Sequence, residues 1–318
     1  MAPLPTLPAA FDPIKFAVRG TPTSALVHVT GQYITTDQTI KTKVLTFDPG
    51  SQLIFDKLDF PFIVVYADQW NLSAHFEIRR GTNFSLNGRS GAPATAPLPT
   101  PPGYGNNGNN GLPGFPGRDG QPGPHLPTVF IFAQQTFFNG RPANSLDVNA
   151  LFYFDGVQGG KGGDGGPGSD GTDGNQGEPA INGGWGDCAS GPGWGGRGGN
   201  AGYGGMPGYG ANGGDAPSVY MFVQPDQLPI FQANGLTVTL KGGSNGFDGR
   251  RGPPGRPGNG GLEGDASGNC SNVGRQGPDG GVPPPCPILE IQKHAGGDGK
   301  EYVTDYIGFA ELQDPPPP

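Results

Sequence analysis

The sequence is poor in apolar residues and contains no long apolar run. Only 33% of its 318 residues are hydrophobic, and no stretch approaches the 18 consecutive apolar residues that a membrane-spanning helix requires. Residues 1–5 also lack the charged-then-apolar order of a secretory signal peptide. We therefore expect no membrane insertion. The composition suggests an extracellular or particle-surface location, with the export route left open.

Basic residues are also scarce, since 19 Lys and Arg stand against 27 Asp and Glu and give a net charge of −8. This balance argues against nucleic acid or an anionic membrane surface as the main partner, because both need clustered positive charge. A phosphate-binding loop is excluded because Lys161 is followed by Gly and Lys300 by Glu.

Metal and catalytic signatures are missing from the sequence as well. The four histidines are scattered and none has a zinc-site neighbour at the usual spacing. The aspartates Asp164, Asp170 and Asp173 sit in a segment superficially like a calcium-binding β-roll, but the large apolar residue of that repeat is absent. Solvated carboxylates on an exposed face are the simpler interpretation. We expect no metal, no cofactor and no enzymatic activity.

What the sequence does have is glycine and proline, at 62 and 37 residues, and the glycines keep a period of three. Unbroken series run from Gly105 to Gly123, Gly156 to Gly177, Gly193 to Gly208 and Gly243 to Gly264. Glycine at every third place suits a polyproline II-type helix with one face crowded against a neighbouring backbone. We expect the neighbours to be segments of the same chain, because the frame breaks fall where hairpin turns would be.

The frame fails once in each of the two long glycine regions, around residues 180–191 and 266–273, and then resumes. Each region therefore predicts one helix running out, a turn and one helix returning. The stretch from Gly88 to Pro102 followed by the series from Gly105 gives a third hairpin. Three hairpins make about six arms, and an eight-triplet arm would extend ~75 Å at the polyproline II rise.

Three cysteines, Cys188, Cys270 and Cys286, allow at most one internal disulfide. Cys188 and Cys270 both fall in predicted distal turns of adjacent hairpins, so we expect them to lie close together and to be disulfide candidates. The alternative is two unrelated loop thiols. The sequence assigns no role to Cys286.

Strand-like segments separate the glycine regions, and three of them repeat one pattern: a Pro start, a β-branched and aromatic centre and a Gln near the end. These are residues 61–69, 127–135 and 217–225. A second strand-like stretch follows each, at residues 75–79, 146–154 and 236–241. Residues 287–292 suggest a truncated fourth copy, and residues 43–47 with 52–55 an N-terminal pair.

The predicted fold is therefore all-β, with short repeated strands forming a sheet or solenoid-like base, intrachain polyglycine/polyproline II hairpins packed as a bundle, and essentially no α-helix. We expect one cooperative unit made of an N-terminal β region, three glycine/proline-rich hairpins that alternate with strand pairs, and a C-terminal strand with a Pro-rich tail. The segments are 1–87, 88–126, 127–155, 156–215, 216–242, 243–285 and 286–318.

Aromatic residues inside the glycine regions are the candidate binding residues, because Trp and Tyr on a rigid scaffold suit stacking on sugars or burial in a partner. The candidates are Trp185, Trp194, Tyr203 and Tyr209. The alternative is that they cap the ends of the arms or fill gaps between them.

The triplet runs, including the collagen-like residues 252–258, resemble two groups of proteins: collagen-like repeat proteins and polyglycine II bundle proteins such as some phage tail-fibre adhesin tips and the snow flea antifreeze protein. The resemblance is one of period and carries over no binding residue. It leaves three hypotheses: a self-assembling filament or surface-layer subunit, an adhesin that binds a cell-surface glycan or receptor through its hairpin tips, and a collagen-type trimer.

Overall fold

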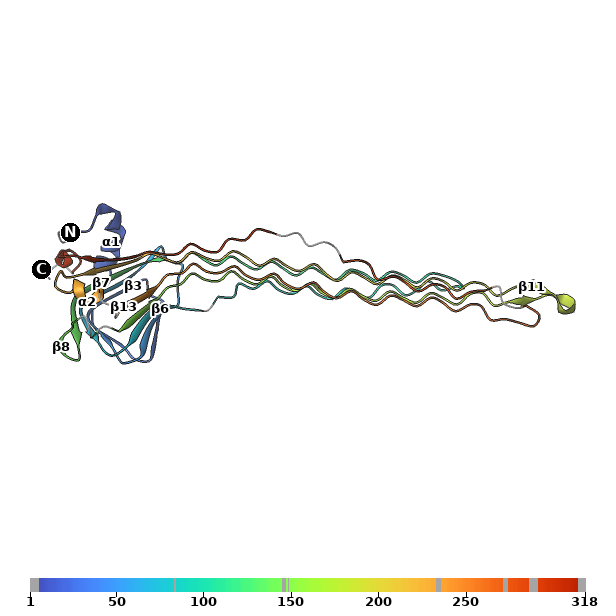
Figure 1. Ribbon diagram of the computed structural model, residues 1–318, viewed down its shortest axis with the longest axis horizontal. Helices are drawn as coiled ribbons and strands as arrows, with labels where there is room; N and C mark the ends of the chain where they lie inside the picture. Colours follow the sequence, from blue (N-terminus) through green and yellow to red (C-terminus); the bar gives the residue numbers. More distant parts are fainter. Residues whose placement is uncertain are drawn as a thin grey trace.

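The computed structural model describes residues 6–82, 84–144, 147, 149–232, 236–270, 274–285 and 291–313. It consists of a β-sheet base at one end and long glycine-rich segments that extend from the base side by side to a distant tip (Figure 1). The described segments nearest the two termini lie at the base (Figure 1). The prediction of a mostly β chain is confirmed.

Two parallel sheets form the base. The seven-stranded sheet has the order β1 (Ser24–Val29), β3 (Thr39–Phe47), β5 (Phe62–Leu72), β7 (Thr128–Phe138), β12 (Val219–Val223) and β14 (Glu301–Asp305), with β8 (Arg141–Pro142) antiparallel to β7. The five-stranded sheet has the order β13 (Leu236–Thr239), β9 (Ala150–Tyr153), β6 (Phe76–Arg80), β4 (Ser51–Phe55) and β2 (Gln32–Thr35). Apart from β8, successive strands of the base alternate between the two sheets, so the strands of both sheets follow the chain in the same spatial direction.

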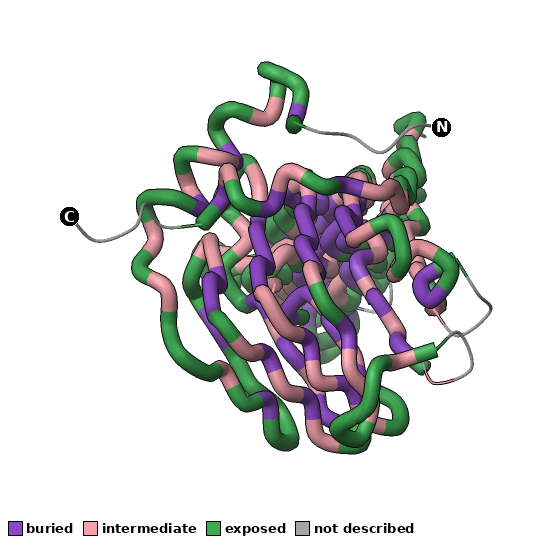
Figure 2. The backbone as a smooth tube through the Cα atoms, turned by 90° about the vertical axis from the view of Figure 1, so that its left-hand side faces the viewer, coloured by how far each residue is buried: buried purple, intermediate pink, exposed green. Residues whose placement is uncertain are grey.

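The core of the base lies between the two sheets, because alternate residues of each strand point inward. Figure 2 shows buried segments alternating with more exposed ones along the strands, and the burial pattern of β4 and β6 alternates strictly. Phe47, Phe76 and Trp70 are among the side chains packed in this core. Phe47 stacks on Phe76 with ring centroids 4.3 Å apart, and the Trp70 indole donates a hydrogen bond of 3.1 Å to the carbonyl of Phe132.

A second, smaller core covers the outer face of the seven-stranded sheet. It unites Tyr66 and Phe132 with residues from both ends of the chain, including Val18 and Phe309. The contributing elements are η1 (Ala9–Phe11), α1 (Asp12–Gly20) and η3 (Phe309–Glu311). Because this sheet is covered on both faces, its central strands read as continuous apolar runs.

Helix α1 corrects the expectation of essentially no α-helix, and a short helix α2 (Leu228–Gln232) follows β12. Pro13 sits in the first turn of α1, where its missing amide hydrogen costs nothing, and Ile14 and Val18 form the buried face four residues apart. Pro22 follows the helix end. The buried face of α1 consists of one apolar pair, Ile14 and Val18, between two prolines. This pattern is too short to predict a helix from the sequence.

The expected strands lie in the sheets with shifted bounds, as β3, β4, β5, β6, β7, β9, β12 and β13. Strands β1, β2 and β14 were not predicted, because their residues are mixed and partly exposed at the ends of the sheets. Residues 287–290 of the suggested fourth copy, part of the stretch 146–154 and Cys286 lie outside the described residues, and residues 291–292 are not in a strand.

Six extended glycine-rich segments, called arms here, leave the base after β6, β9 and β13 and return to it. They are arm I (85–102), arm II (105–124), arm III (156–180), arm IV (191–216), arm V (241–266) and arm VI (274–285 with 291–300). Arms I, III and V run toward the tip and form the outgoing layer. Arms II, IV and VI run back and form the returning layer.

Backbone hydrogen bonds join the arms at every third residue. Within the outgoing layer, amides of arm III from Gly156 to Ala180 donate to carbonyls of arm V from Lys241 to Asp265, with the two arms parallel. Between layers the pairing is antiparallel, as in arm IV, where Gly196 donates to Asn175 and Gly214 to Val157. These bonds satisfy backbone groups that an isolated extended chain would leave to water.

The glycine positions follow from how close the arms approach. A Cβ added at Gly160 would lie 1.8 Å from the carbonyl oxygen of Leu86, and one at Gly204 would lie 1.7 Å from that of Gly252. No side chain fits at such distances, so only glycine permits this packing. Arms III and IV have neighbours on four sides and carry several paired glycines, such as Gly162-Gly163, whereas the edge arm II carries one glycine per triplet and the edge arm V is paired only at Gly242-Gly243 and Gly260-Gly261.

Candidate functional site

The tip of the molecule is a small hairpin that extends beyond the arms (Figure 1). It consists of β10 (Ile181–Asn182), η2 (Gly184–Gly186) and β11 (Cys188–Ser190), with β10 antiparallel to β11. A disulfide joins Cys188 of this hairpin to Cys270 of the next one, with the two Cα atoms 4.9 Å apart. Two hairpins are thus covalently connected at the end farthest from the base.

Trp185 is fully exposed at this tip, and its backbone adopts the left-handed conformation with φ of 60°. A non-glycine residue rarely adopts this conformation, so the surrounding structure must hold it there. The amide of Gly183 donates to the carbonyl of Asp187 at 2.7 Å, and the Asn269 amide side chain donates to the carbonyl of Gly186. Together with the disulfide, these contacts present the indole outward on a fixed turn.

The other three candidate aromatics lie apart from Trp185, in one column along arm IV. Trp194, Tyr203 and Tyr209 are separated by multiples of three residues, so they project from the same side of the returning layer. Trp194 is 63% exposed and Tyr203 42% exposed, while Tyr209 is half-buried. The Arg275 guanidinium from arm VI lies 5.6 Å from the Trp194 ring centroid, a cation–π contact between neighbouring arms.

Asp and Asn residues that precede the donating glycines have a role that sequence reasoning missed. Asp164 Oδ1 accepts the amide of Arg250 at 2.8 Å, and the next residue, Gly165, donates to the carbonyl of Arg250 at 2.8 Å. One Asp-Gly pair therefore holds both backbone groups of one residue on the parallel neighbouring arm. We call this arrangement the Asx–Gly clamp.

The clamp recurs in both layers and between every pair of parallel arms. The acceptor side chains followed by a donating glycine are Asn87, Asn107, Asn110, Asp119, Asp155, Asp164, Asp170, Asp173 and Asn212. Asn200 and Asp215 make the same pair of bonds with Ala201 and Ala216 in place of the glycine. Asp164, Asp170 and Asp173, interpreted above as solvated carboxylates, are exposed or half-buried but accept backbone amides. The signal available in the sequence was the position of Asp or Asn directly before a glycine of the frame.

The clamp affects acidity at Asp164. The hydrogen bond from the Arg250 amide, and next the Lys161 ammonium at 3.2 Å, hold the pKa of the Asp164 carboxyl below its ordinary value. Hydrogen bonds to the charged form favour that form. The carboxylate is therefore kept ionised as an acceptor.

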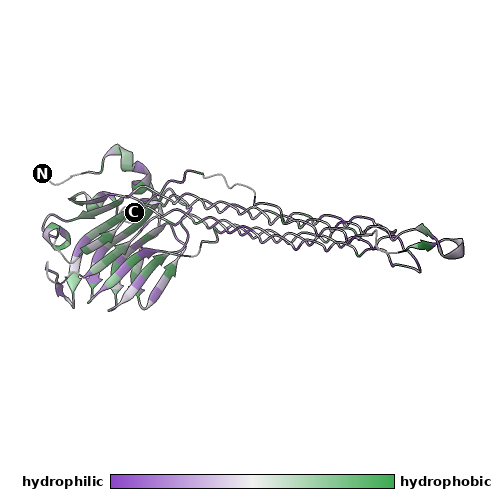
Figure 3. Ribbon diagram, turned by 45° about the vertical axis from the view of Figure 1, so that its right-hand side comes forward, coloured by the Kyte–Doolittle hydropathy of each residue, from purple (hydrophilic) through white to green (hydrophobic). Residues whose placement is uncertain are grey.

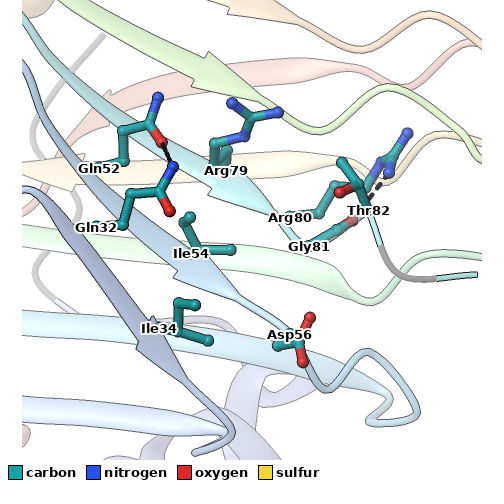
Figure 4. A pocket seen from close by; sticks show the side chains of 9 residues that line it. All are labelled: Gln32, Ile34, Gln52, Ile54, Asp56, Arg79, Arg80, Gly81 and Thr82. Atoms are coloured by element: carbon teal, nitrogen blue, oxygen red, sulfur yellow. Dashed lines mark hydrogen bonds between the residues drawn. The ribbon is translucent and has the colours of Figure 1, made fainter.

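A shallow pocket lies on the outer face of the five-stranded sheet near its β2 edge (Figure 4). Gln32 donates to Gln52 at 3.1 Å, and Gln52 donates to Glu77 at 2.8 Å, forming a side-chain ladder across β2, β4 and β6. Ile34 and Ile54 line the pocket beside this ladder (Figure 4).

Arg80, at the end of this pocket, connects the base to the arms. Its guanidinium is buried and donates to the carbonyls of Gly81, Asp155 and Gly156, at the root of arm III. Burial lowers the pKa of Arg80 below its ordinary value. Because its bonds go to backbone carbonyls, Arg80 acts as a structural tie at the point where arm III leaves the sheets.

Among the described residues, no group of three or more His, Cys, Asp or Glu is arranged to hold a metal ion. None of the described helices is long and apolar enough to cross a membrane.

Comparison with known proteins gives little support for a family. No family model matches the chain, and no curated protein matches it. A solved structure of a nine polyproline type II helical bundle antifreeze protein from the springtail Granisotoma rainieri is 22% identical and covers 65% of this chain and 100% of its own. The TM-score is 0.11, so this likeness carries no argument about fold or function.

Proposed function

We propose that this chain is a non-enzymatic structural protein, the subunit of a filament or surface layer. In this proposal the arms are polyglycine/polyproline II helices packed as a bundle, and the alternating parallel strands make the base solenoid-like. The bundle is a stiff rod that holds the tip away from the base.

The observation that carries the proposal is the regular hydrogen bonding of six arms at every third residue. A rod cross-linked in this way along its length resists bending, since bending would break many backbone bonds at once. Two pockets of the base, one beside Ile34 and Ile54 and one beside Val27 and Ile40, are open to solvent, which favours a mechanical role over a substrate site. Open sheet edges at both ends of the base provide surfaces for self-assembly.

Negative-stain electron microscopy of the purified chain over a range of concentrations tests this proposal. We expect regular fibres or two-dimensional arrays from which rods project at constant spacing. Discrete single particles at every concentration would contradict the filament or layer role. A solution mass of three intertwined chains would instead support a collagen-type trimer.

A second function, adhesion through the tip, is favoured by one observation: the fully exposed Trp185 on a disulfide-held turn. An indole held in this way suits stacking on a cell-surface glycan or insertion into a receptor. Binding of labelled protein to a glycan array or to cells should fall at least ~10-fold in Trp185→Ala. Phe247→Ala is the matched control, because Phe247 is also exposed but lies on arm V away from the tip. Equal binding by both variants would rule out the tip.

A further inference from the structure

The seven-stranded sheet ends in partial strand positions on both sides. At its first end, β1 pairs with β3 only from Ser24↔Thr42 onward, so the start of β3 at Thr39 extends beyond β1. At its other end, β14 pairs with β12 along Val219–Val223. Each end therefore presents a step in place of a straight edge.

The two steps are complementary in register. Following Cα partners across β12, β7, β5 and β3, Tyr302 of β14 lies at the level of Thr39, and Asp305 lies at the level of Thr42. Strand β1 begins at that same level with Ser24. If a second copy followed the first along the sheet, β14 up to Thr304 and the second copy's β1 from Ser24 onward would fill the two halves of one strand position.

The five-stranded sheet has the matching vacancy. It ends at β13, so among the described residues no strand of this sheet lies beside β13 at the level of β14, and its other end is β2. Following partners across β9, β6 and β4, Thr237 of β13 lies at the level of Gln32, and Thr239 lies at the level of Ile34. A second copy's β2 would therefore lie level with β13.

Hydrogen-bonding directions at these edges agree with this pairing. The carbonyls of Gly31 and Thr35 accept from β4, so the alternate residues Gln32 and Ile34 direct their backbone groups to the open edge. The carbonyl of Thr239 accepts from Phe154, so Val238 directs its groups to the opposite open edge. Val238 is level with Tyr33, and in a parallel ladder it would bond to the residues on either side of Tyr33.

The core is also incompletely covered at these ends. Tyr33 is 38% exposed, although its level partners Leu53, Ile78 and Phe152 are buried. A hollow at this end of the core is lined by residues that include Val27, Tyr33, Thr39 and Ile40, where the half strand is missing. At the other end, Tyr302 is 41% exposed and stacks on Tyr220 with centroids 4.6 Å apart.

The edge of the outgoing arm layer at arm V differs from the ends of the base, because prolines occupy positions that would donate backbone hydrogen bonds to a further arm. In arm V, the positions equivalent to the donating glycines of arm III include Pro254 and Pro257, which have no amide hydrogen to offer a further arm. Strands β2 and β13 contain no proline or lysine, the residues that usually protect exposed edges. The base ends are therefore the surfaces left open to pairing.

We propose that copies of this chain stack head to tail, with β13 and β14 of one copy pairing in parallel with β2 and β3 of the next. Each junction completes one strand position in both sheets. The partner is a second copy of this chain, and the inference rests on the proposed structural function because it names the surface by which subunits assemble.

Engineered disulfides test the register, in a Cys286→Ser background that removes the third cysteine. Gln32→Cys with Thr237→Cys places the two thiols on level residues, about 4.8 Å apart across neighbouring strands and within disulfide range. Gln32→Cys with Thr239→Cys is the matched control, since the offset of two residues puts the Cα atoms roughly 8 Å apart. On oxidation we expect a ladder of covalent multimers from the first pair, at least ~10-fold more abundant than from the control.

A second pair of variants tests the edge without cysteines. Ile34→Pro removes an amide that faces the open edge and keeps the amides that bond to β4, whereas Ile34→Thr keeps the edge amide. Sedimentation should show shorter polymers for Ile34→Pro at a melting temperature like that of Ile34→Thr. Equal polymer length for the two variants would contradict the proposed contact.

The outcomes separate this inference from the proposed function. Fibres in wild-type samples without cross-linking of the level pair overturn the head-to-tail register and leave the structural role standing. Covalent dimers from Gln32→Cys alone indicate antiparallel pairing of two β2 edges and also overturn it. Wild-type protein that stays monomeric at every concentration overturns both proposals.

Discussion

The base and the arms are two ways of stabilising one chain. In the base, side chains such as Trp70, Phe76 and Phe152 fill the space between two sheets, and the backbone bonds lie within the sheets. In the arms, the backbones themselves pack against one another and the side chains face outward. Figure 3 shows the difference as apolar strands in the base and pale or polar arms. Burial of apolar side chains stabilises the base, and glycines, which have a hydrogen in place of Cβ, allow the close packing of the arms.

This difference has an energetic consequence. Burying apolar surface contributes about 25 cal/mol per Å², whereas a backbone hydrogen bond contributes only ~1 kcal/mol net. Ordering a glycine also costs more conformational entropy than ordering any other residue. Arms made of glycine therefore depend on being anchored, at the base by the sheets and Arg80 and at the tip by the Cys188–Cys270 disulfide.

Truncating the core of the base should have the largest effect. Trp70→Ala removes a fully buried indole and its hydrogen bond to Phe132, so we expect the free energy of unfolding to fall by about 3–5 kcal/mol. Denaturant unfolding followed by Trp and far-UV signals measures this loss. Phe16→Ala is the control, because Phe16 is exposed on α1 and should change stability by less than ~0.5 kcal/mol. Similar values for both variants would contradict the assigned core.

Removing the tip disulfide should come next and should act on the arms. The cross-linked cysteines are 82 residues apart, and loop-closure entropy for such a loop corresponds to about 4.5 kcal/mol at most. In Cys188→Ser with Cys270→Ser, hydrogen exchange should accelerate in residues 177–193 and 261–270, while β5 and β7 keep wild-type protection. Unchanged exchange at the tip would show that the arms need no covalent anchor there.

The sequence allowed the arms to be predicted better than the ends of the base. Glycine at every third place is a steric requirement that no other residue meets, so the frame and its breaks located six extended segments and two distal turns. The Gly-Gly pairs of arms III and IV were an unused signal, because two crowded sides imply a central position in the layers. Strands β1, β2 and β14 were missed because edge strands bury little and need no apolar alternation.

The clamp residues and Arg80 were missed for a different reason. Asp164 is polar and only half-buried, so neither burial nor apolar pattern marks it, and its role depends on which residue of arm V lies opposite. That register follows from the lengths of the turns and from the sheet pairing at the base. Arg80 likewise bonds to Asp155 and Gly156, carbonyls 75 and 76 residues away, which no local pattern reveals.

A methyl group in a central arm should cost less than a lost core side chain but should be specific to the arms. Gly204→Ala puts a Cβ at 1.7 Å from the carbonyl oxygen of Gly252, so arms IV and V must separate, with an expected loss of about 1–3 kcal/mol. Gly184→Ala is the matched control, because nothing lies within 4 Å of its Cβ position. Thermal unfolding and exchange in residues 195–213 provide the measurement, and equal results for both variants would contradict the close packing.

Acid sensitivity is the smallest expected effect. A different carboxylate contributes to it in each region, Asp164 in the arms and Asp147 in the base. The Arg250 amide and the Lys161 side chain lower the pKa of Asp164 in arm III, and the hydrogen bond from the Arg141 side chain lowers the pKa of Asp147 in the base. A pKa lowered by folding means that the stabilisation is complete above the unfolded value of about 4 and is lost as the pH falls through the folded pKa. Both regions should therefore weaken in acid.

Substitution by Asn separates these contributions, because an amide oxygen can still accept a hydrogen bond but does not titrate. Between pH 7 and 3, Asp164→Asn should reduce the acid-induced rise in exchange of arms III and V, and Asp147→Asn should reduce it only in the loop beside Arg141. The Asn variant at 164 should keep arm protection near neutral pH, because Asn fills the same clamp position at Asn107 and Asn110. If Asp164→Asn loses protection at pH 7 as well, the negative charge itself, and not the oxygen acceptor, stabilises the arms.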